Sequence, residues 1–153
     1  MTANKYYRNY PNFRNPCRTI FILHFQFSFL FYFYNMNVET LREYCLSKKG
    51  AKEDFPFGET TLVFKVMNKM FLLVSLNASP LQFNAKCDPD KAIELRELYD
   101  AVQPGYHMNK KHWNTIIIDG NIPQKLLKEM IDDSYELIVQ SLPKKEREKL
   151  EKF

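Results

Sequence analysis

The spacing of apolar residues changes several times after Met36, and each spacing predicts one kind of element. Apolar residues three or four positions apart over residues 38–48, with Gly50 just beyond, predict an amphipathic helix ended by a glycine. Because residues 67–69 form a very short connection, the first two strands that follow are expected to pair as an antiparallel hairpin. Alternation of apolar and polar residues predicts three strands, over residues 60–66, 70–76 and 81–87.

The segment between the first helix and the first strand, residues 51–59, is predicted to be a loop. Pro56 and Gly58 interrupt regular structure there. Phe55 and Phe57 stand on either side of the proline, and we expect both rings to anchor the loop to the core.

The second half of the chain predicts two more helices with a strand between them. Asp88, followed by a proline, opens a helix that runs to Tyr99. Residues 113–119 form a strand, and the loop or short strand before it completes a second hairpin. Residues 123–142 carry the longest helical apolar band. The mixed-charge tail, residues 144–153, is predicted to be a solvated helical end.

This order of elements predicts an α+β fold, in which an antiparallel sheet made of a meander and a hairpin packs against helices on one face. Strands and helices do not alternate regularly, which argues against a doubly wound nucleotide-binding fold. The chain has 153 residues and is expected to hold one domain, residues 36–153, preceded by an extension of residues 1–35.

Residues 1–35 are a different kind of sequence, because they hold 12 of the 23 aromatic residues. Their apolar run, residues 20–34, is shorter than the about 18 to 20 residues of a membrane anchor, and no small-residue cleavage site of a signal peptide follows it. The residue types are those that A/T-rich codons specify. An over-extended gene start is therefore the favoured interpretation. A genuine membrane anchor and a disordered or docking arm stay open.

Charge and cysteines limit the kind of partner. The formal net charge of +4 lies entirely in residues 1–35, and from Met36 onward 18 basic residues balance 18 acidic ones. Attraction of an acidic partner must therefore come from local clusters. Cys17, Cys45 and Cys87 are odd in number and show no Cys-x-x-Cys spacing, so we expect reduced, mostly buried thiols in a cytoplasmic protein.

Residues 104–115 gather the side chains best suited to contact a ligand. Two lysines, two histidines, two asparagines, a tyrosine and the only tryptophan offer charge, hydrogen bonds and flat surfaces. Structural roles compete with this interpretation. Lys110 and Lys111 also suit a solvated turn, and Trp113, which precedes an apolar strand, also suits the core. Asparagines in such a turn often bond their own backbone.

Neither a catalytic unit nor a metal site is predicted. His107 and His112 have no carboxylate or thiolate at a useful local spacing, and no serine, cysteine or acid stands beside them for acid–base or nucleophilic chemistry. The sequence therefore predicts a protein that is not an enzyme and has neither a metal nor another cofactor.

Several separate blocks of the sequence also resemble one known family. The blocks are residues 53–58, 61–66, 69–71, 86–89, 104–114 and 131–135. In this order they resemble the MmcQ/YjbR family of bacterial proteins, described as DNA-binding with a double-wing motif and a CyaY-like fold. The resemblance covers about residues 36–143. It implies a compact α+β domain that binds DNA through its sheet hairpins and the loop after the second helix.

Together, these observations predict a small DNA-binding protein that contacts mainly the phosphate backbone, with weak sequence preference. The alternative is a protein- or small-ligand-binding module of the same fold without a nucleic-acid role. Convergence of the lysines on one face would favour DNA, and their dispersal would favour the alternative. The candidate contact residues are Lys65, Lys69, Lys86, Tyr106, His107, Asn109, Lys110, Lys111, His112, Trp113 and Asn114.

Overall fold

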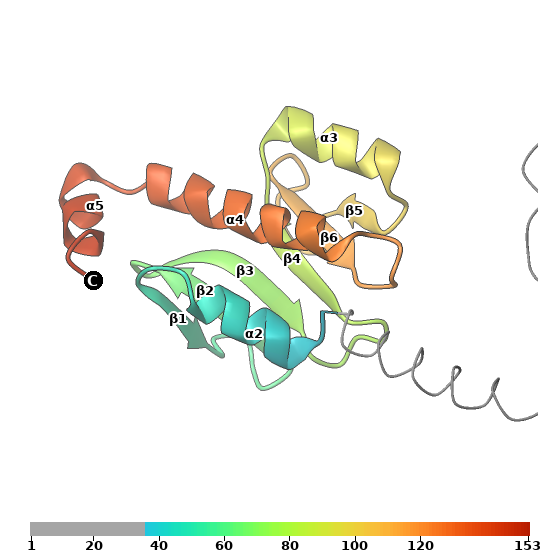
Figure 1. Cartoon of the computed structure of the whole chain (residues 1–153), viewed down its shortest axis with the longest axis horizontal. Coiled ribbons are helices and arrows are strands. Elements are labelled where there is room, and N and C mark those ends of the chain that lie inside the picture. Colours follow the sequence, from blue (N-terminus) through green and yellow to red (C-terminus); the bar gives the residue numbers. More distant parts are fainter. Residues whose placement is uncertain (1–35) are drawn as a thin grey trace, which may run out of the picture. The chain divides into compact units, whose positions relative to one another are not determined.

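The computed structural model describes residues 36–153, and within them six antiparallel strands form one sheet in the order β1-β2-β3-β4-β6-β5 (Figure 1). The strands are β1 (Ala51–Asp54), β2 (Thr61–Val66), β3 (Lys69–Ser75), β4 (Gln82–Lys86), β5 (Val102–Pro104) and β6 (Trp113–Ile117). The helices are α2 (Val38–Leu46), α3 (Pro89–Leu98), α4 (Gln124–Gln140) and α5 (Lys144–Leu150). The predicted α+β class, the β2–β3–β4 meander and the β5–β6 hairpin are confirmed.

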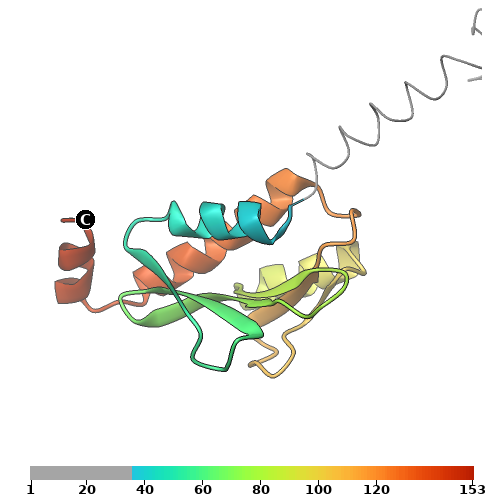
Figure 2. The ribbon, with the colours of Figure 1, turned by 90° about the horizontal axis from the view of Figure 1, so that it is seen from below.

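Helices α2, α3 and α4 lie on one side of the sheet, which we call the helix side (Figure 2). The core forms there because alternate residues of each strand point toward the helices. Phe71 of β3 meets Tyr135 of α4 edge to face, with ring centroids 5.5 Å apart. Phe64 of β2 and Phe83 of β4 are also fully buried. The aromatic rings of three neighbouring strands therefore join the sheet to the longest helix.

Two helices, α2 and α3, begin at polar residues whose side chains cap them. Asn37 caps α2 in a capping box, accepting from the Thr40 backbone N–H at 2.8 Å. Asp88 caps α3 and accepts from the backbone N–H groups of Asp90 and Lys91. Both residues satisfy backbone donors that a helix leaves unpaired in its first turn.

The loop prediction for residues 51–59 was wrong over its first four residues, because Ala51–Asp54 forms β1 and pairs with β2. Glu53 of β1 points to the helix side, where its carboxylate accepts two hydrogen bonds of 2.5 Å from Arg42 of α2. Phe55 and Phe57 are 47% and 59% exposed, so they do not anchor this segment to the core as expected.

The C-terminal tail is helical, as predicted, but it is also docked onto the domain. Leu150 of α5 is buried and packs over Gly50, where a side chain would collide with it. Lys49 Nζ donates to the Glu151 carbonyl oxygen at 2.7 Å. Helix α5 therefore closes the core beside the turn between α2 and β1.

Cys45 and Cys87 are buried free thiols, as the sequence predicts, and Cys17 lies outside the described residues. Burial raises the pKa of Cys45 to about 12, so its thiol stays protonated at neutral pH. In the part of the chain that the structure describes, no helix has both the length and the apolar character needed to cross a membrane.

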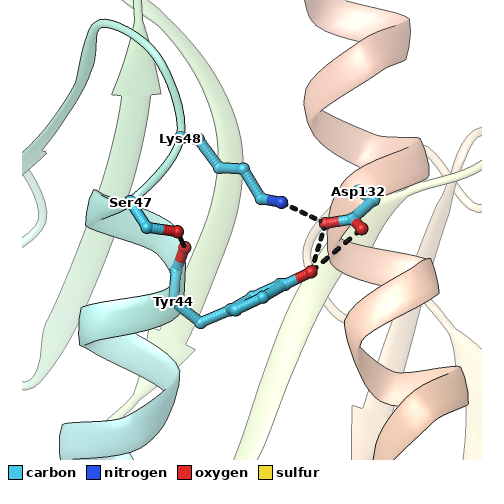
Figure 3. A network of polar contacts seen from close by, with 4 residues as sticks. All are labelled: Tyr44, Ser47, Lys48 and Asp132. Carbon is cyan, nitrogen blue, oxygen red and sulfur yellow. Dashed lines mark hydrogen bonds and ion pairs between the residues drawn. The ribbon is translucent and has the colours of Figure 1, made fainter.

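A polar network joins α2 to α4 (Figure 3). The Tyr44 hydroxyl lies 2.9 Å from both carboxylate oxygens of Asp132 and donates to them, and Lys48 Nζ lies 2.5 Å from Oδ1 of the same carboxylate. Burial and the Asp132 hydrogen bond raise the pKa of Tyr44. The neutral phenol is therefore kept as a donor, and the network fixes the two helices against each other.

Replacing Asp132 with alanine should lower the free energy of unfolding by about 1 kcal/mol more than replacing the adjacent Asp133 does. Asp132 loses both Tyr44 and Lys48, whereas Asp133 pairs only with the half-exposed Lys91. Both substitutions introduce one alanine into α4, so the difference between their losses of unfolding free energy reports the contribution of the network. Urea denaturation of the two variants measures it, and equal losses would contradict the role of the network.

Candidate functional site

The sheet surface opposite the helices carries the side chains that are not used by the core, and we call it the open face. Strand alternation and pairing register assign its members. They are Lys52, Asp54, Thr61, Val63, Lys65, Met70, Leu73, Ser75, Gln82, Asn84, Lys86, Gln103, Trp113, Thr115 and Ile117. Three of these residues are buried: Val63 and Leu73, which pair with each other at the centre of the face, and Thr115 of β6.

Three lysines lie at one end of the open face. Lys52 pairs with Lys65 across β1 and β2, and Lys65 pairs with Met70 of β3. Lys86 follows the β4 residue that pairs with Leu72, and it pairs with Trp113 of β6. These positions all lie at the end of the sheet where the β2–β3 turn is found. The register therefore brings together lysines that are far apart in the sequence.

The loop of residues 105–112 begins at the same end of the sheet, between β5 and β6. The Gly105 N–H donates to the Trp113 carbonyl oxygen at 2.8 Å, and the Cys87 N–H donates to the His112 carbonyl oxygen at 2.8 Å. A Cβ on Gly105 would lie only 2.8 Å from Cβ of Trp113, so the close approach of these two backbones requires glycine. The backbone thus ties both ends of the 105–112 loop to the sheet.

Arg96 of α3 holds the same loop from the helix side. Its Nε donates to Oδ1 of Asn114 at 2.8 Å, and its Nη2 donates to the carbonyl oxygens of Lys110 and Trp113 at 2.6 and 3.2 Å. A planar guanidinium can serve several acceptors at once, whereas an ammonium group acts as a point charge. Arg96 was not among the predicted site residues, because its partners lie 14 to 18 residues further along the chain and no local pattern points to them.

A second hydrogen-bond network fixes the loop over the open face. The Tyr106 N–H donates to Oγ1 of Thr115 at 2.9 Å, and that hydroxyl donates to Oδ1 of Asn84 at 2.6 Å. Nδ2 of Asn84 reaches back to the Tyr106 carbonyl oxygen at 3.4 Å. The position of Tyr106 is therefore set by its backbone. The residue remains 66% exposed, and its ring lies against that of His107 at a tilt of 53°, with centroids 3.9 Å apart.

The predicted contact residues divide into accessible and structural ones. Lys110 and Lys111 are exposed on the loop, and Trp113 and His112 are half-buried. Asn109 is exposed, but its Oδ1 accepts from the Lys111 backbone N–H at 3.0 Å. Asn114 is only 2% exposed and binds Arg96, so its side chain belongs to the domain interior.

Two of the predicted lysines have partners within the domain. Lys65 Nζ lies 2.5 Å from Oδ2 of Asp54, and this hydrogen bond lowers the pKa of the Asp54 carboxyl. Lys69 Nζ donates to the Ser141 carbonyl oxygen at 3.0 Å, at the C-terminus of α4, where a helix leaves carbonyl groups unpaired. No carboxylate of residues 36–153 lies within 4.0 Å of the ammonium groups of Lys86, Lys110 or Lys111.

Charge is divided between the two sides of the sheet. The open face and the 105–112 loop together carry five lysines and one acid, Asp54, a net charge of +4. Helices α2, α3 and α4 carry five basic and nine acidic residues, a net charge of −4. The net neutrality of residues 36–153 therefore hides a strong asymmetry. Within these residues, no three histidine, cysteine or acidic side chains gather to form a metal site.

A family model named YjbR matches residues 46–137, more than half of the chain. The chain belongs to the YjbR family. It is 36% identical over 113 residues to protein YbdF of Escherichia coli O157:H7, an alignment that covers 73% of this chain and 92% of that protein. It is 30% identical over 115 residues to protein YjbR of Escherichia coli strain K12, covering 75% of this chain and 98% of that protein.

Solved structures share the fold of this YjbR-family chain. The crystal structure of protein DR2400 from Deinococcus radiodurans, which contains the domain DUF419, matches with a TM-score of 0.71 and 39% identity, over 76% of this chain and 88% of that one. A protein from Pseudomonas syringae matches with a TM-score of 0.59 and 27% identity, over 67% of this chain and 98% of that one. The names of these relatives state no activity, so the ligand must be inferred from the site.

Arg96→Lys should loosen the 105–112 loop, because an ammonium group cannot reproduce the three hydrogen bonds of the guanidinium. Amide hydrogen exchange in a peptide covering residues 105–114 should speed up, while exchange in β2 and β3 should stay unchanged. Arg42→Lys is the matched control, since Arg42 binds only Glu53 at the opposite edge of the sheet. Unchanged exchange of the loop in Arg96→Lys would contradict the positioning role of Arg96.

Proposed function

We propose that this YjbR-family protein binds DNA through the open face and the 105–112 loop, holding phosphate groups without catalysing a reaction. The observation that carries the proposal is the division of charge, +4 on this side against −4 on the helices. A polyanion is attracted by one side and repelled by the other, so the same charges would also orient it.

The residue types fit contacts to the phosphate backbone. The basic groups of the open face and loop are all lysines, whose compact ammonium groups act as point charges and do not require the bidentate geometry of base recognition. Contacts to phosphate position a protein on DNA but carry no sequence information. Binding is therefore proposed to have weak sequence preference.

Four lysines support the proposal more strongly than the others. Lys52, Lys86, Lys110 and Lys111 have no carboxylate partner within the described residues, whereas Lys65 is paired with Asp54. Lys69, which binds the end of α4, has a structural role. Four phosphate contacts would give a slope of log affinity against log salt of about −3.6.

A small-ligand-binding role is the second candidate, because a groove lies beside the edge strand β1. Its charged lining residues are Lys52, Glu53, Asp54 and Lys65, and Phe153 of the C-terminus closes one side. Because two lysines and two acids balance there, the groove would suit a small polar molecule that carries charges of both signs. DNA is favoured because Lys86, Lys110 and Lys111 lie outside the groove and extend the basic surface across the sheet. A cytoplasmic location fits either role.

The double substitution Lys110→Ala/Lys111→Ala should weaken DNA binding and reduce the salt slope from about −3.6 to about −1.8. Fluorescence anisotropy of a labelled oligonucleotide at several salt concentrations measures both quantities. Lys144→Ala/Lys145→Ala is the matched control, because it removes two adjacent exposed lysines from α5 and should leave the slope unchanged. Equal slopes in the wild type and the Lys110/Lys111 variant would remove this loop from the interface.

Asp54→Asn should tighten DNA binding by about threefold, since it removes the acid of the open face and frees Lys65 for phosphate. The salt slope should become steeper by up to about 0.9. Asp133→Asn makes the same change of net charge on α4 and should have a smaller effect on affinity. Weaker or unchanged binding by Asp54→Asn would place the DNA elsewhere on the molecule.

A further inference from the structure

Aromatic side chains are exposed on two loops at opposite edges of the open face. Phe55 and Phe57 belong to the loop of residues 55–60, between β1 and β2, and are 47% and 59% exposed. Tyr106, in the 105–112 loop between β5 and β6, is 66% exposed. Both loops project from the sheet on the side away from the helices (Figure 2). The open face therefore has exposed rings at two of its corners, and one of them, Tyr106, lies at the basic end.

Backbone hydrogen bonds hold both loops in defined conformations. The Phe55 N–H donates to the side-chain Oδ1 of Asp54 at 2.8 Å, and the Thr61 N–H donates to the Gly58 carbonyl oxygen at 3.2 Å. Gly58 has a φ of +93°, a backbone conformation that residues other than glycine rarely adopt. Tyr106 is fixed by its bond to Thr115. The rings are thus presented on ordered turns, which lowers the entropic cost of using them to bind a ligand.

We propose that the open face binds single-stranded DNA, with unpaired bases stacked on Phe55, Phe57 and Tyr106 and with phosphates held by the lysines of the open face and the 105–112 loop. This inference rests on the proposed function and names its substrate. Bases in a duplex already stack on one another, so their flat faces are closed to protein rings. In a single strand these faces are free, and aromatic side chains above a basic groove are the usual way to bind them.

The size of the sheet fits a short single strand of DNA. Neighbouring strands lie about 4.8 Å apart and each residue extends a strand by about 3.3 Å, and the two loops lie at opposite edges and at opposite ends of the sheet, so roughly 30 Å separates them. A separation of this size suits a site of several nucleotides, within the range of about 4 to 16 that a single OB fold accommodates. Lys86 lies beside the 105–112 loop, and Lys52 and Lys65 lie at the same end of the sheet, on the strands that lead to the 55–60 loop at the other end.

The test compares the full chain on three ligands: a labelled single strand of about 12 nucleotides, the matched duplex, and the same duplex with a central unpaired bubble. We expect about tenfold tighter binding to the single strand and the bubble than to the duplex. The triple variant Phe55→Leu/Phe57→Leu/Tyr106→Leu should bind the single strand about tenfold more weakly or worse, with less than about a twofold change on the duplex.

Leucine keeps apolar volume at exposed positions, so thermal unfolding should show a folded domain, and Phe57→Leu alone provides a milder variant. The control Ile93→Ala/Leu98→Ala removes exposed apolar side chains from α3, on the helix side, and should leave binding unchanged. Equal affinity for single strand and duplex, unaffected by the ring substitutions, would overturn this inference and leave the proposed function standing. Absence of binding to all three ligands at low salt would overturn both.

Discussion

Because successive side chains of a strand point to opposite faces, covering only one face with helices sorts every strand residue into one of two roles. On the helix side, Phe64, Phe71 and Phe83 build the core with α4. The same strands leave Lys65 and Lys86 on the other face, where no helix can neutralise them. A one-residue change of register would exchange the two sets, so the stability of the core also fixes the composition of the candidate site.

The two sides of the sheet are connected through α3. Arg96 lies on the helix side, yet its guanidinium binds the carbonyl oxygens of Lys110 and Trp113 and the buried amide of Asn114. The Asn114 amide oxygen is buried and would otherwise lose solvation without gaining a partner, which is costly for a buried polar group. The placement of the exposed lysines therefore depends on a residue that no ligand on the open face would touch.

The sequence predicts the helices and strands in which apolar residues recur at a regular spacing. The strands β2, β3 and β4 and the helices follow their apolar patterns, but β1, with the sequence Ala-Lys-Glu-Asp, has none. It becomes a strand because β2 pairs with it and Arg42 binds Glu53, both of which are tertiary contacts. The prediction that Phe55 and Phe57 anchor their loop to the core was wrong for a related reason. Hydrophobicity alone does not distinguish a ring that is buried in the core from one that is exposed on a loop.

The lysines show the same limit within the site. Alternation along β2 and β4 is enough to place Lys65 and Lys86 on one face, but the acceptor of Lys69 is a carbonyl group 72 residues away. Lys65 differs again, since Asp54 already compensates its charge and a phosphate would have to replace that carboxylate. Lys52, Lys86, Lys110 and Lys111 have no such competitor among the described residues. A polyanion should therefore engage these four first, and Lys65 should contribute only as its pairing with Asp54 is broken.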